Sequence, residues 1–325
     1  MAGRDQMGFV EAFASPKLGR NAQLDRIAAE VKWYRFEKLL KKLEPEAAGR
    51  PPYDPLVMFK ALLLAQLYTL SDAGLEFALN DRVSFRRFLG LALENDAPDH
   101  TTLCRFRNRL IEAGLAERLF AEFDRQIEAR GFVLKQGTMI DATVVEAAGR
   151  PPRRNDFAEA SDPDARFVKI EGKTGSTYGY KAHIGVDQGT RLIRAALLTP
   201  ANVNETVVAD GLVRGDECAV YADKAYAKRA RRAWLKSAGI KPRIMHKSWG
   251  GGPPLTHWQK RHNRLIAPIR ASVETVFAVL KRRLGYRAVR YFGLVKNQAH
   301  LLLLALAYNM RRAADLALRP RPQSV

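Results

Sequence analysis

Residues 269–285 read "IRASVETVFAVLKRRLG" and predict a helix with one buried face. Apolar residues recur at the spacing of a core-facing helix, namely at Ile269, Val273, Phe277, Leu280 and Leu284. Glu274 is the only acidic residue from Lys224 to Ala314, a stretch that holds 21 Lys and Arg. A carboxylate that only balanced this charge would be expected to have acidic neighbours. Glu274 is therefore a candidate functional residue.

The excess positive charge of the chain is confined to this stretch. The 325 residues include 54 Lys and Arg and 34 Asp and Glu, a formal net charge of +20. Outside residues 224–314, 33 basic and 33 acidic residues remain. A local positive field predicts a polyanionic partner, and nucleic acid is the usual one. A membrane surface is the competing partner, but we find no basic amphipathic helix with a broad Trp, Phe and Leu face.

Length and composition predict a cytoplasmic protein of two or three domains. The most apolar run, residues 301–310, is too short to span a membrane and predicts a buried terminal helix. The N-terminus has no long apolar segment, so a secretory signal is not expected. Cys104 and Cys218 lack Cys or His neighbours at ligand spacing, which argues against a zinc site or a disulfide framework.

The first 130 residues predict a helical domain. Asp54 and Pro55 are a typical helix start, and the residues up to 70 are almost wholly apolar. Residues 98–114, "PDHTTLCRFRNRLIEAG", predict a helix that carries Arg105, Arg107 and Arg109. This pattern is compatible with a helix-turn-helix reader of DNA, and an ordinary helical bundle with a solvated basic face explains it as well.

The hydrophobic period changes near residues 131–137, which predicts a domain boundary there. The segments that follow predict three strands, a helix, a strand, a helix, a strand and a helix. The first strands are joined as a hairpin, so the fold class is α/β with a mixed sheet covered by helices. The loop at 149–176 shows no core pattern. No glycine-rich phosphate loop follows a strand, so a nucleotide cofactor is unsupported.

Two further acids lie where core residues are expected. Asp141 is inside the strand "MIDATVV", and Asp223 ends the strand in "AVYADKAY". Burying an ionised carboxylate is costly unless it is paired or bound to a metal. Two strands and a helix that each bring one acid to a sheet edge would form a site for Mg²⁺ or Mn²⁺. Each acid also has a structural explanation, as a turn cap for Asp141 and an ion pair with Lys224 or Lys228 for Asp223.

Arg270 and Lys281 share a helix face with Glu274, because these positions fall within roughly 40° of one another. One interpretation is an ion pair worth a few tenths of a kcal/mol. The other is a metal-binding carboxylate beside two cations that hold phosphates. The basic helix at 228–236, which includes Lys228 and Arg232, is a further candidate DNA contact.

Several other residues fit structural roles better. Asp187, Glu146, Asp162 and Asp164 are expected to be structural or solvated. Trp249 and Trp258 could stack on an exposed base, although core packing is the simpler interpretation.

These motifs resemble a known family. The spacing of Arg270, Glu274 and Lys281 resembles the C-terminal signature of bacterial insertion-sequence transposases of the DDE superfamily, in particular the insertion-sequence-five group. "MIDATVV" and "YADKAY" resemble its two aspartate motifs, and "YDPLVMFKALLLAQLYTLSD" with "PDHTTLCRFRNRL" is similar to its N-terminal domain. One position departs from the signature, since Ala267 stands where a tyrosine is expected.

The resemblance implies an RNase H-like catalytic domain at residues 131–315 with the catalytic, metal-binding triad Asp141, Asp223 and Glu274. It also implies a helical domain at residues 1–130 that binds terminal inverted repeats, and a flexible tail at 316–325. Only 50 residues separate Asp223 from Glu274, which argues against a large β insertion domain there.

The implied reaction is hydrolysis at the ends of a mobile element, followed by attack of the freed 3′-hydroxyl on target DNA. The implied cofactor is Mg²⁺ or Mn²⁺, with two ions per active site. The implied partners are double-stranded DNA and a second copy of the chain, or a larger assembly, at the bacterial nucleoid. Two alternative functions are also compatible with the sequence: a stand-alone metal nuclease, and an inactive DNA-binding protein derived from a transposase. A ribosomal-type RNA-binding protein would explain the charge but not the carboxylates.

Overall fold

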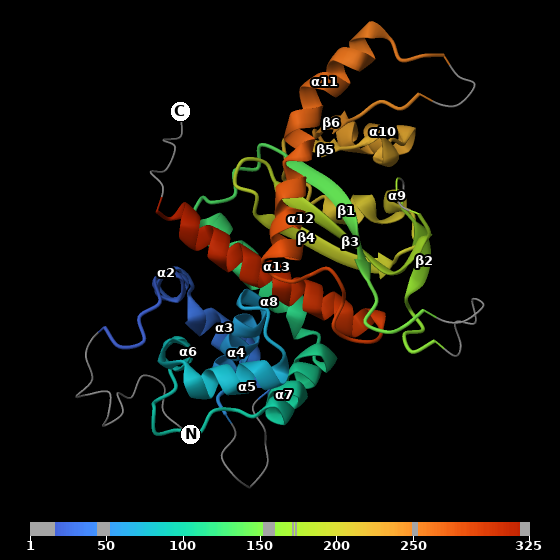
Figure 1. Ribbon diagram of the computed structural model, residues 1–325. Coiled ribbons are helices and arrows are strands. Elements are labelled where there is room, and N and C mark those ends of the chain that lie inside the picture. Colours follow the sequence, from blue (N-terminus) through green and yellow to red (C-terminus); the bar gives the residue numbers. More distant parts are fainter. Residues whose placement is uncertain are drawn as a thin grey trace. The chain divides into compact units, whose positions relative to one another are not determined.

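The computed structural model describes residues 17–43, 53–151, 160–170, 172, 174–248 and 253–318 (Figure 1). The chain separates into two compact units. Unit 1 comprises Met1–Arg130 with Leu302–Val325, and unit 2 comprises Gly131–Leu301.

Unit 1 is helical, as predicted. Its helices in chain order are α2 (Ala22–Glu30), α3 (Trp33–Leu40), η1 (Lys41–Leu43), α4 (Pro55–Leu67), α5 (Asp72–Asp81), α6 (Val83–Leu89), α7 (His100–Glu112) and α8 (Leu115–Ala129). The Asp54 side chain caps α4 by accepting a hydrogen bond from the Leu56 N–H at 2.7 Å. Most of α4 is buried, as its apolar sequence requires. No single described helix is long and apolar enough to cross a membrane, although α4 and α5, bent by 105°, meet the same criteria as a pair.

The last helix, α13 (Leu294–Leu316), contains the division between the units. Its residues from Leu302 onward group with unit 1, where Asp315 forms an ion pair with Arg26 of α2 at 3.8 Å. This division differs from the predicted end of the catalytic domain at residue 315, because the C-terminal half of α13 packs with the helical unit. Of the predicted tail, residues 319–325 lie outside the described residues.

Unit 2 is built on a mixed sheet with β1 (Thr138–Glu146) at its centre. β1 pairs antiparallel with β3 (Ser176–Asp187) and parallel with β5 (Ala219–Ala222), and β5 pairs parallel with β6 (Lys241–Ile244). β4 (Ile193–Pro200) returns along β3 as the predicted hairpin. A short strand, β2 (Arg166–Lys169), pairs with residues 176–179 of β3 and was missed in the loop at 149–176.

Helices cover the sheet as predicted. One face, which includes Ile140 of β1, packs against η3 (Ala209–Leu212), η4 (Lys224–Tyr226) and α10 (Arg229–Ser237). The short helix α9 (Glu205–Val208) contacts η3 and η4. Since neighbouring residues of a strand point to opposite faces, Met139 and Asp141 point the other way. That face meets α11 (His257–Ala271) and α12 (Val273–Arg282), where the Ser272 hydroxyl contacts the Met139 sulfur at 2.8 Å.

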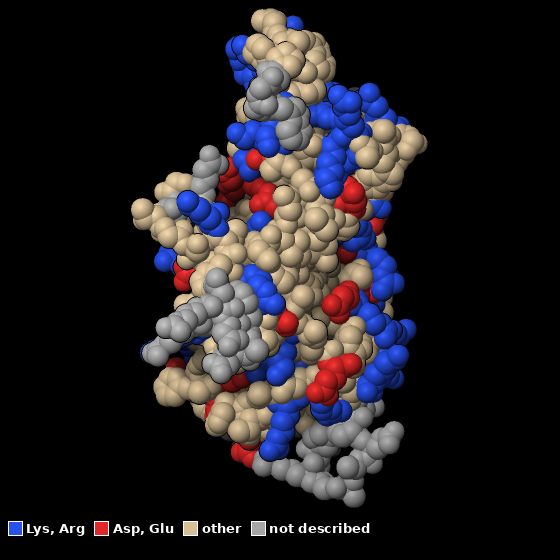
Figure 2. Space-filling view, turned by 90° about the vertical axis from the view of Figure 1, so that its right-hand side faces the viewer, with Lys and Arg blue, Asp and Glu red and all other residues tan. Residues whose placement is uncertain are grey.

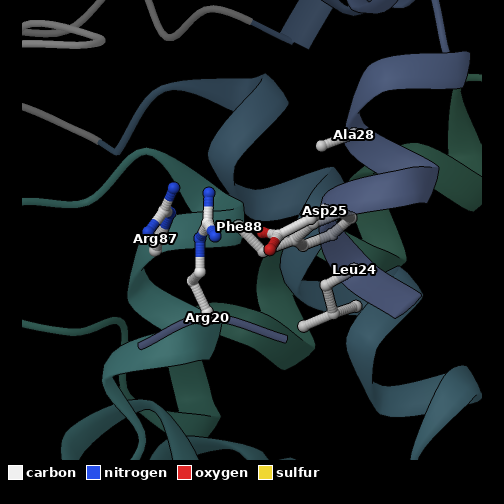
Figure 3. Close-up of a pocket in the computed structure, with 6 residues that line it drawn as sticks. All are labelled: Arg20, Leu24, Asp25, Ala28, Arg87 and Phe88. Carbon is white, nitrogen blue, oxygen red and sulfur yellow. The ribbon is translucent and has the colours of Figure 1, made fainter. Parts of the chain in front are cut away.

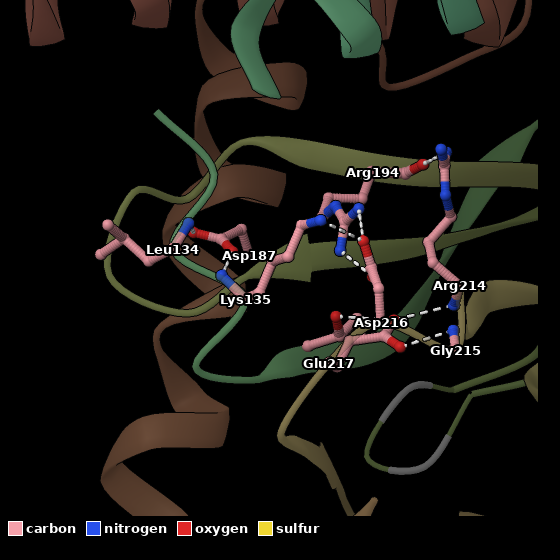
Figure 4. Close-up of polar contacts among 9 residues, drawn as sticks. Leu134, Lys135, Asp187, Arg194, Arg214, Gly215, Asp216 and Glu217 are labelled. Atoms are coloured by element: carbon pink, nitrogen blue, oxygen red, sulfur yellow. Dashed lines mark hydrogen bonds and ion pairs between the residues drawn. The ribbon is translucent and has the colours of Figure 1, made fainter. Parts of the chain in front are cut away.

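Buried polar contacts fix the end of the β3–β4 hairpin and the entry to β1 (Figure 4). Asp187 is fully buried, and its carboxylate accepts hydrogen bonds from the Thr190 hydroxyl at 2.5 Å and the Lys135 N–H at 3.1 Å. Arg194 of β4 is paired with Asp216 at 2.7 Å and 3.0 Å, and Lys135 reaches the same carboxylate at 3.0 Å. The structural role predicted for Asp187 fits these contacts.

Candidate active site

The two aspartates come from neighbouring parallel strands. Thr138 pairs with Val220 and Met139 with Tyr221, so continuing this register places Asp141 level with Asp223. β1 and β5 are not paired beyond this point, and ligands bind at the carboxyl ends of parallel strands in such sheets. Asp223 also caps η4 by accepting a hydrogen bond from the Ala225 N–H at 2.6 Å.

Arg270 joins Asp141 to Glu274. Its guanidinium donates to the Asp141 carboxylate at 2.6 Å and to the Glu274 carboxylate at 3.0 Å. The helical ion pair is therefore present, but the same guanidinium also holds a strand residue far away in the sequence. The side chain of Asp141 is 11% exposed and that of Glu274 is 64% exposed. Glu274 thus stands at the solvent side of a site whose floor is Asp141.

The electrostatics of Asp141 favour a bound cation. Burial raises the pKa of its carboxyl to about 6, although Arg270 opposes the shift. The carboxylates of Asp223 and Glu205 raise this pKa further, so each lies close enough to repel the Asp141 carboxylate. Oxygen ligands of this kind suit Mg²⁺ or Mn²⁺, and a divalent ion would relieve the repulsion.

The three predicted ligands do not already surround one point. Among the described residues, no group of three or more acids, His or Cys is arranged around a common metal position. The reason is visible in the contacts, since Glu274 reaches toward Arg270. The donor set fits a hard divalent ion in its chemistry, and Glu274 must turn away from Arg270 to complete it.

Two residues near the aspartates were missed by sequence reasoning. Glu205 begins α9 and lies 3.6 Å from the ammonium of Lys181, a residue of β3. The hydroxyl of Tyr226 is buried close to the Glu205 carboxylate. Burial raises the pKa of Tyr226, and Glu205, Asp141 and Asp223 raise it further. An acid in the first turn of a helix is common, so the sequence carried no signal for Glu205.

The predicted cations of unit 2 have different surroundings. The ammonium of Lys281 donates to the Val144 carbonyl of β1 at 3.1 Å, close along the strand to Asp141. Arg232 is half-buried and donates to the carbonyls of Ile244 at 2.7 Å and Met245 at 3.3 Å. Lys228 is exposed, with its ammonium 3.5 Å from the Thr206 carbonyl. Lys281 therefore packs against β1 three residues beyond Asp141, whereas Arg232 contributes to the fold.

The three arginines of α7 do not form a uniform basic face. Arg107 is buried, 6% exposed, and pairs with Asp72 at 2.7 Å. This burial corrects the prediction that Arg107 contacts DNA, because a paired core guanidinium is not presented to a ligand. Arg109 donates to the Leu43 carbonyl at 2.5 Å, while Arg105 is exposed. Arg105 and the exposed part of Arg109 stay predictions as DNA contacts.

Unit 1 has a shallow pocket of its own, which contains none of the candidate acids (Figure 3). Its volume is about 320 Å³, and Arg20 and Arg87 lie side by side along it, near Asp25. Its remaining lining residues are Leu24, Ala28 and Phe88. The candidate chemistry is therefore in unit 2 and not in this hollow.

Comparison with known proteins identifies the family. Residues 134–310 match the family described as "Transposase DDE domain", and residues 13–109 match "Transposase domain (DUF772)". The chain belongs to the DDE transposase family. This DDE transposase has an RNase H-like fold, which follows an N-terminal helical region in the sequence, as predicted. Members of the family are phosphoryl-transfer enzymes that use divalent metal ions.

Two solved structures show low similarity to this DDE transposase. The piggyBac transposase synaptic complex with hairpin DNA is 14% identical, covers 91% of this chain and 74% of its own, and has a TM-score of 0.43. The Mos1 strand transfer complex is 12% identical, with coverage of 89% and 86% and a TM-score of 0.20.

Proposed function

We propose that the chain is an insertion-sequence transposase of the insertion-sequence-five group. It cuts DNA at the terminal inverted repeats of its element and transfers the freed 3′-hydroxyl to target DNA. The observation that carries this proposal is the contact of one guanidinium, Arg270, with both Asp141 and Glu274, beside Asp223. Asp141 and Asp223 thus stand at the open end of a parallel strand pair, and Arg270 links Asp141 to Glu274.

The residues have distinct roles in this proposal. Asp141, Asp223 and Glu274 hold Mg²⁺ or Mn²⁺, with two ions in the complete site. Bound ions of this kind activate a water or hydroxyl and stabilise the leaving oxygen of a phosphoryl displacement. Arg270 and Lys281 bind the phosphates on either side of the scissile bond, Arg270 bidentately and Lys281 as a point charge. The protein supplies no nucleophile of its own, so its contribution is positioning and charge stabilisation.

The partners follow from the reaction. Double-stranded DNA, both transposon end and target, binds the basic surface of residues 224–314. Joining two ends requires two active sites, so we propose a homodimer or larger synaptic assembly. We place the protein in the bacterial cytoplasm, where it meets the nucleoid.

The test is cleavage and joining of a labelled duplex that carries the ends of the element, in Mg²⁺. Wild type is expected to cut at the 3′ end and to join it to a second duplex, while Glu274→Gln binds DNA but does neither. Glu146→Gln is the matched control, because Glu146 is an exposed acid on β1 outside the proposed ligand set. A loss of activity below detection corresponds to at least three powers of ten, or ~4 kcal/mol in barrier.

The other readings give different results in the same assay. A stand-alone metal nuclease cuts without joining. An inactive DNA-binding descendant binds the ends and is inert with Mg²⁺ or Mn²⁺. Full activity in Glu274→Gln would contradict the assignment of the third carboxylate.

A further inference from the structure

Trp258 lies in a cluster of three aromatic rings at the N-terminal end of α11. Its ring stacks on His262 with 5.4 Å between centroids and 22° between planes. His246 meets both rings edge-on, at 5.5 Å from Trp258 and 5.0 Å from His262. Despite these contacts Trp258 is 63% exposed, which contradicts the expectation of core packing. Trp249 lies outside the described residues.

Hydrogen bonds of Asn263 and a helix cap fix the backbone that carries the cluster. The side chain of Asn263 accepts a hydrogen bond from the His246 N–H at 2.8 Å and donates to the His246 carbonyl at 3.0 Å. A capping box between Thr256 and Gln259 fixes the first turn of α11. An exposed ring on a fixed backbone loses little conformational entropy when a ligand stacks on it.

The exposed rings continue as a stripe along the helix. At about 100° per residue, His262 and Leu265 fall within roughly 40° of Trp258. Leu265 is 65% exposed. The stripe is therefore an incompletely covered apolar surface.

Cations flank this stripe on both sides. Arg261 follows it on α11 and is exposed, and Arg243 of β6 is exposed as well. Burial lowers the pKa of His262, and the charges of Arg232 and Arg243 lower it further, which places both guanidinium groups near its ring. Burial and Arg232 likewise lower the pKa of His246. In Figure 2, Lys and Arg side chains gather around the end of unit 2 that carries α10 and the N-terminal half of α11.

We infer that Trp258 and His262 form a stacking platform for an unpaired DNA base. Aromatic rings between cations suit a base and its phosphates, whereas an apolar protein surface would not need the flanking charge. The inference rests on the proposed function and extends it, because Trp258 and Arg270 lie on one helix. Twelve residues of α11 place the platform about 18 Å along the axis from Arg270, or about five stacked nucleotides from the scissile phosphate.

The test uses a duplex that ends at the element's cleavage site and continues as a single-stranded tail of eight thymines, in which one position at a time is replaced by 2-aminopurine. The wild-type protein is expected to quench the fluorescence of the base at one or two positions about five nucleotides from the junction. Trp258→Ala is expected to abolish this quenching and to weaken binding of the tailed duplex by about tenfold. Affinity for a blunt duplex is expected to stay within twofold.

Controls separate stacking from folding and charge. Trp234→Ala removes another exposed tryptophan, on α10, that contacts no other ring within the described residues, and it is expected to behave as wild type. Trp258→Phe keeps a ring and is expected to retain most of the affinity. Equal quenching by wild type and Trp258→Ala would overturn the inference, and so would equal weakening for tailed and blunt duplexes.

The result is independent of catalysis. If the protein quenches at a fixed position but does not cut its element's ends, the result supports the platform and contradicts the proposed function. If the protein cuts and joins but the fluorescence does not depend on position, the result supports the proposed function and contradicts the platform.

Discussion

At the scale of single residues, the site combines a buried carboxylate, Asp141, with one arginine that partly neutralises its charge. Asp141 is enclosed by the sheet and by α11, and its carboxylate lies near those of Asp223 and Glu205. Arg270 offsets part of this charge by binding Asp141 and Glu274 together. In the metal-free protein the Asp141 carboxylate is therefore still repelled by its acidic neighbours, and a bound divalent ion would reduce this repulsion.

Replacing Asp141 by Asn should stabilise the metal-free protein at neutral pH. Burial raises the folded-state pKa of Asp141 to about 6, above the ~3.9 of an unfolded Asp, so the folded state binds this proton more tightly than the unfolded state. The destabilisation is absent below pH ~4, grows between pH ~4 and ~6, and is complete above that. We expect Asp141→Asn to raise the free energy of unfolding by roughly 2–3 kcal/mol at pH 8.

Urea unfolding in EDTA at pH 8 and at pH 4 checks this prediction. The stability gain should be present at pH 8 and nearly absent at pH 4. Glu146→Gln should show no comparable pH dependence, since Glu146 is exposed. A gain of the same size at both pH values would show that packing, not ionisation, explains it.

At the scale of elements, the break between α11 and α12 positions the charged groups. The helix expected at 269–285 is divided at Ser272, and Pro268, which lacks an N–H, precedes the break by one turn. The Ser272 N–H and hydroxyl both donate to the Ile269 carbonyl, at 3.1 Å and 2.7 Å. Arg270 thus comes from the last turn of α11 and Glu274 from the first turn of α12, both against β1.

Removing the arginine tests whether it competes with the metal ion. Arg270→Gln is expected to bind Mn²⁺ about tenfold more tightly in the absence of DNA, or ~1.4 kcal/mol, because a positive charge beside the carboxylates is lost. The same variant should lose DNA cleavage, since the phosphate contact is lost too. Free Mn²⁺ is measured by electron paramagnetic resonance.

Arg282→Gln is the control for this measurement, because Arg282 is an exposed cation at the other end of α12. It should leave Mn²⁺ affinity within about twofold. Weaker Mn²⁺ binding by Arg270→Gln would mean that the arginine helps to order the ligands.

The predictable features are those that depend on local sequence. The sequence pattern located β1 and β5 and predicted that the first strands form a hairpin, and Asp54 with Pro55 located the start of α4. Asp141 and Asp223 were predicted as ligands because each follows residues that belong to a core, and Glu274 because it is the only acid in a basic stretch. All three lie where that reasoning placed them, on β1, after β5 and on α12.

The features that escaped prediction depend on tertiary partners. β2 has only four residues and forms because β3 offers it an edge. Arg107 is buried by its ion pair with Asp72 of α5, which lies 35 residues earlier in the sequence. Glu205 belongs to a four-residue helix whose Thr206 carbonyl is held by the buried Arg231 at 2.5 Å. None of these partners is within a helical turn in the sequence, so no periodicity reports them.

At the scale of the molecule, charge and chemistry are concentrated in the same unit. Twenty-one of the 54 basic residues fall between Lys224 and Ala314 with a single acid, and 19 of them precede Leu302 and so belong to unit 2. The remaining sequence is balanced. Such a field attracts DNA without reading its sequence. In the proposed function, Mg²⁺ or Mn²⁺ ions screen the few acids that lie in this field. The central claim is that Asp141, Asp223 and Glu274 share those ions.

Iron-directed cleavage of the polypeptide tests that claim most directly. Fe²⁺ is bound in place of Mg²⁺, and ascorbate with peroxide then cuts the backbone near the ion. We expect cuts close to residues 141, 223 and 274, suppressed by excess Mg²⁺ and absent in Asp141→Asn. Cuts at other positions, or the same three cuts in Asp141→Asn, would contradict a shared metal site.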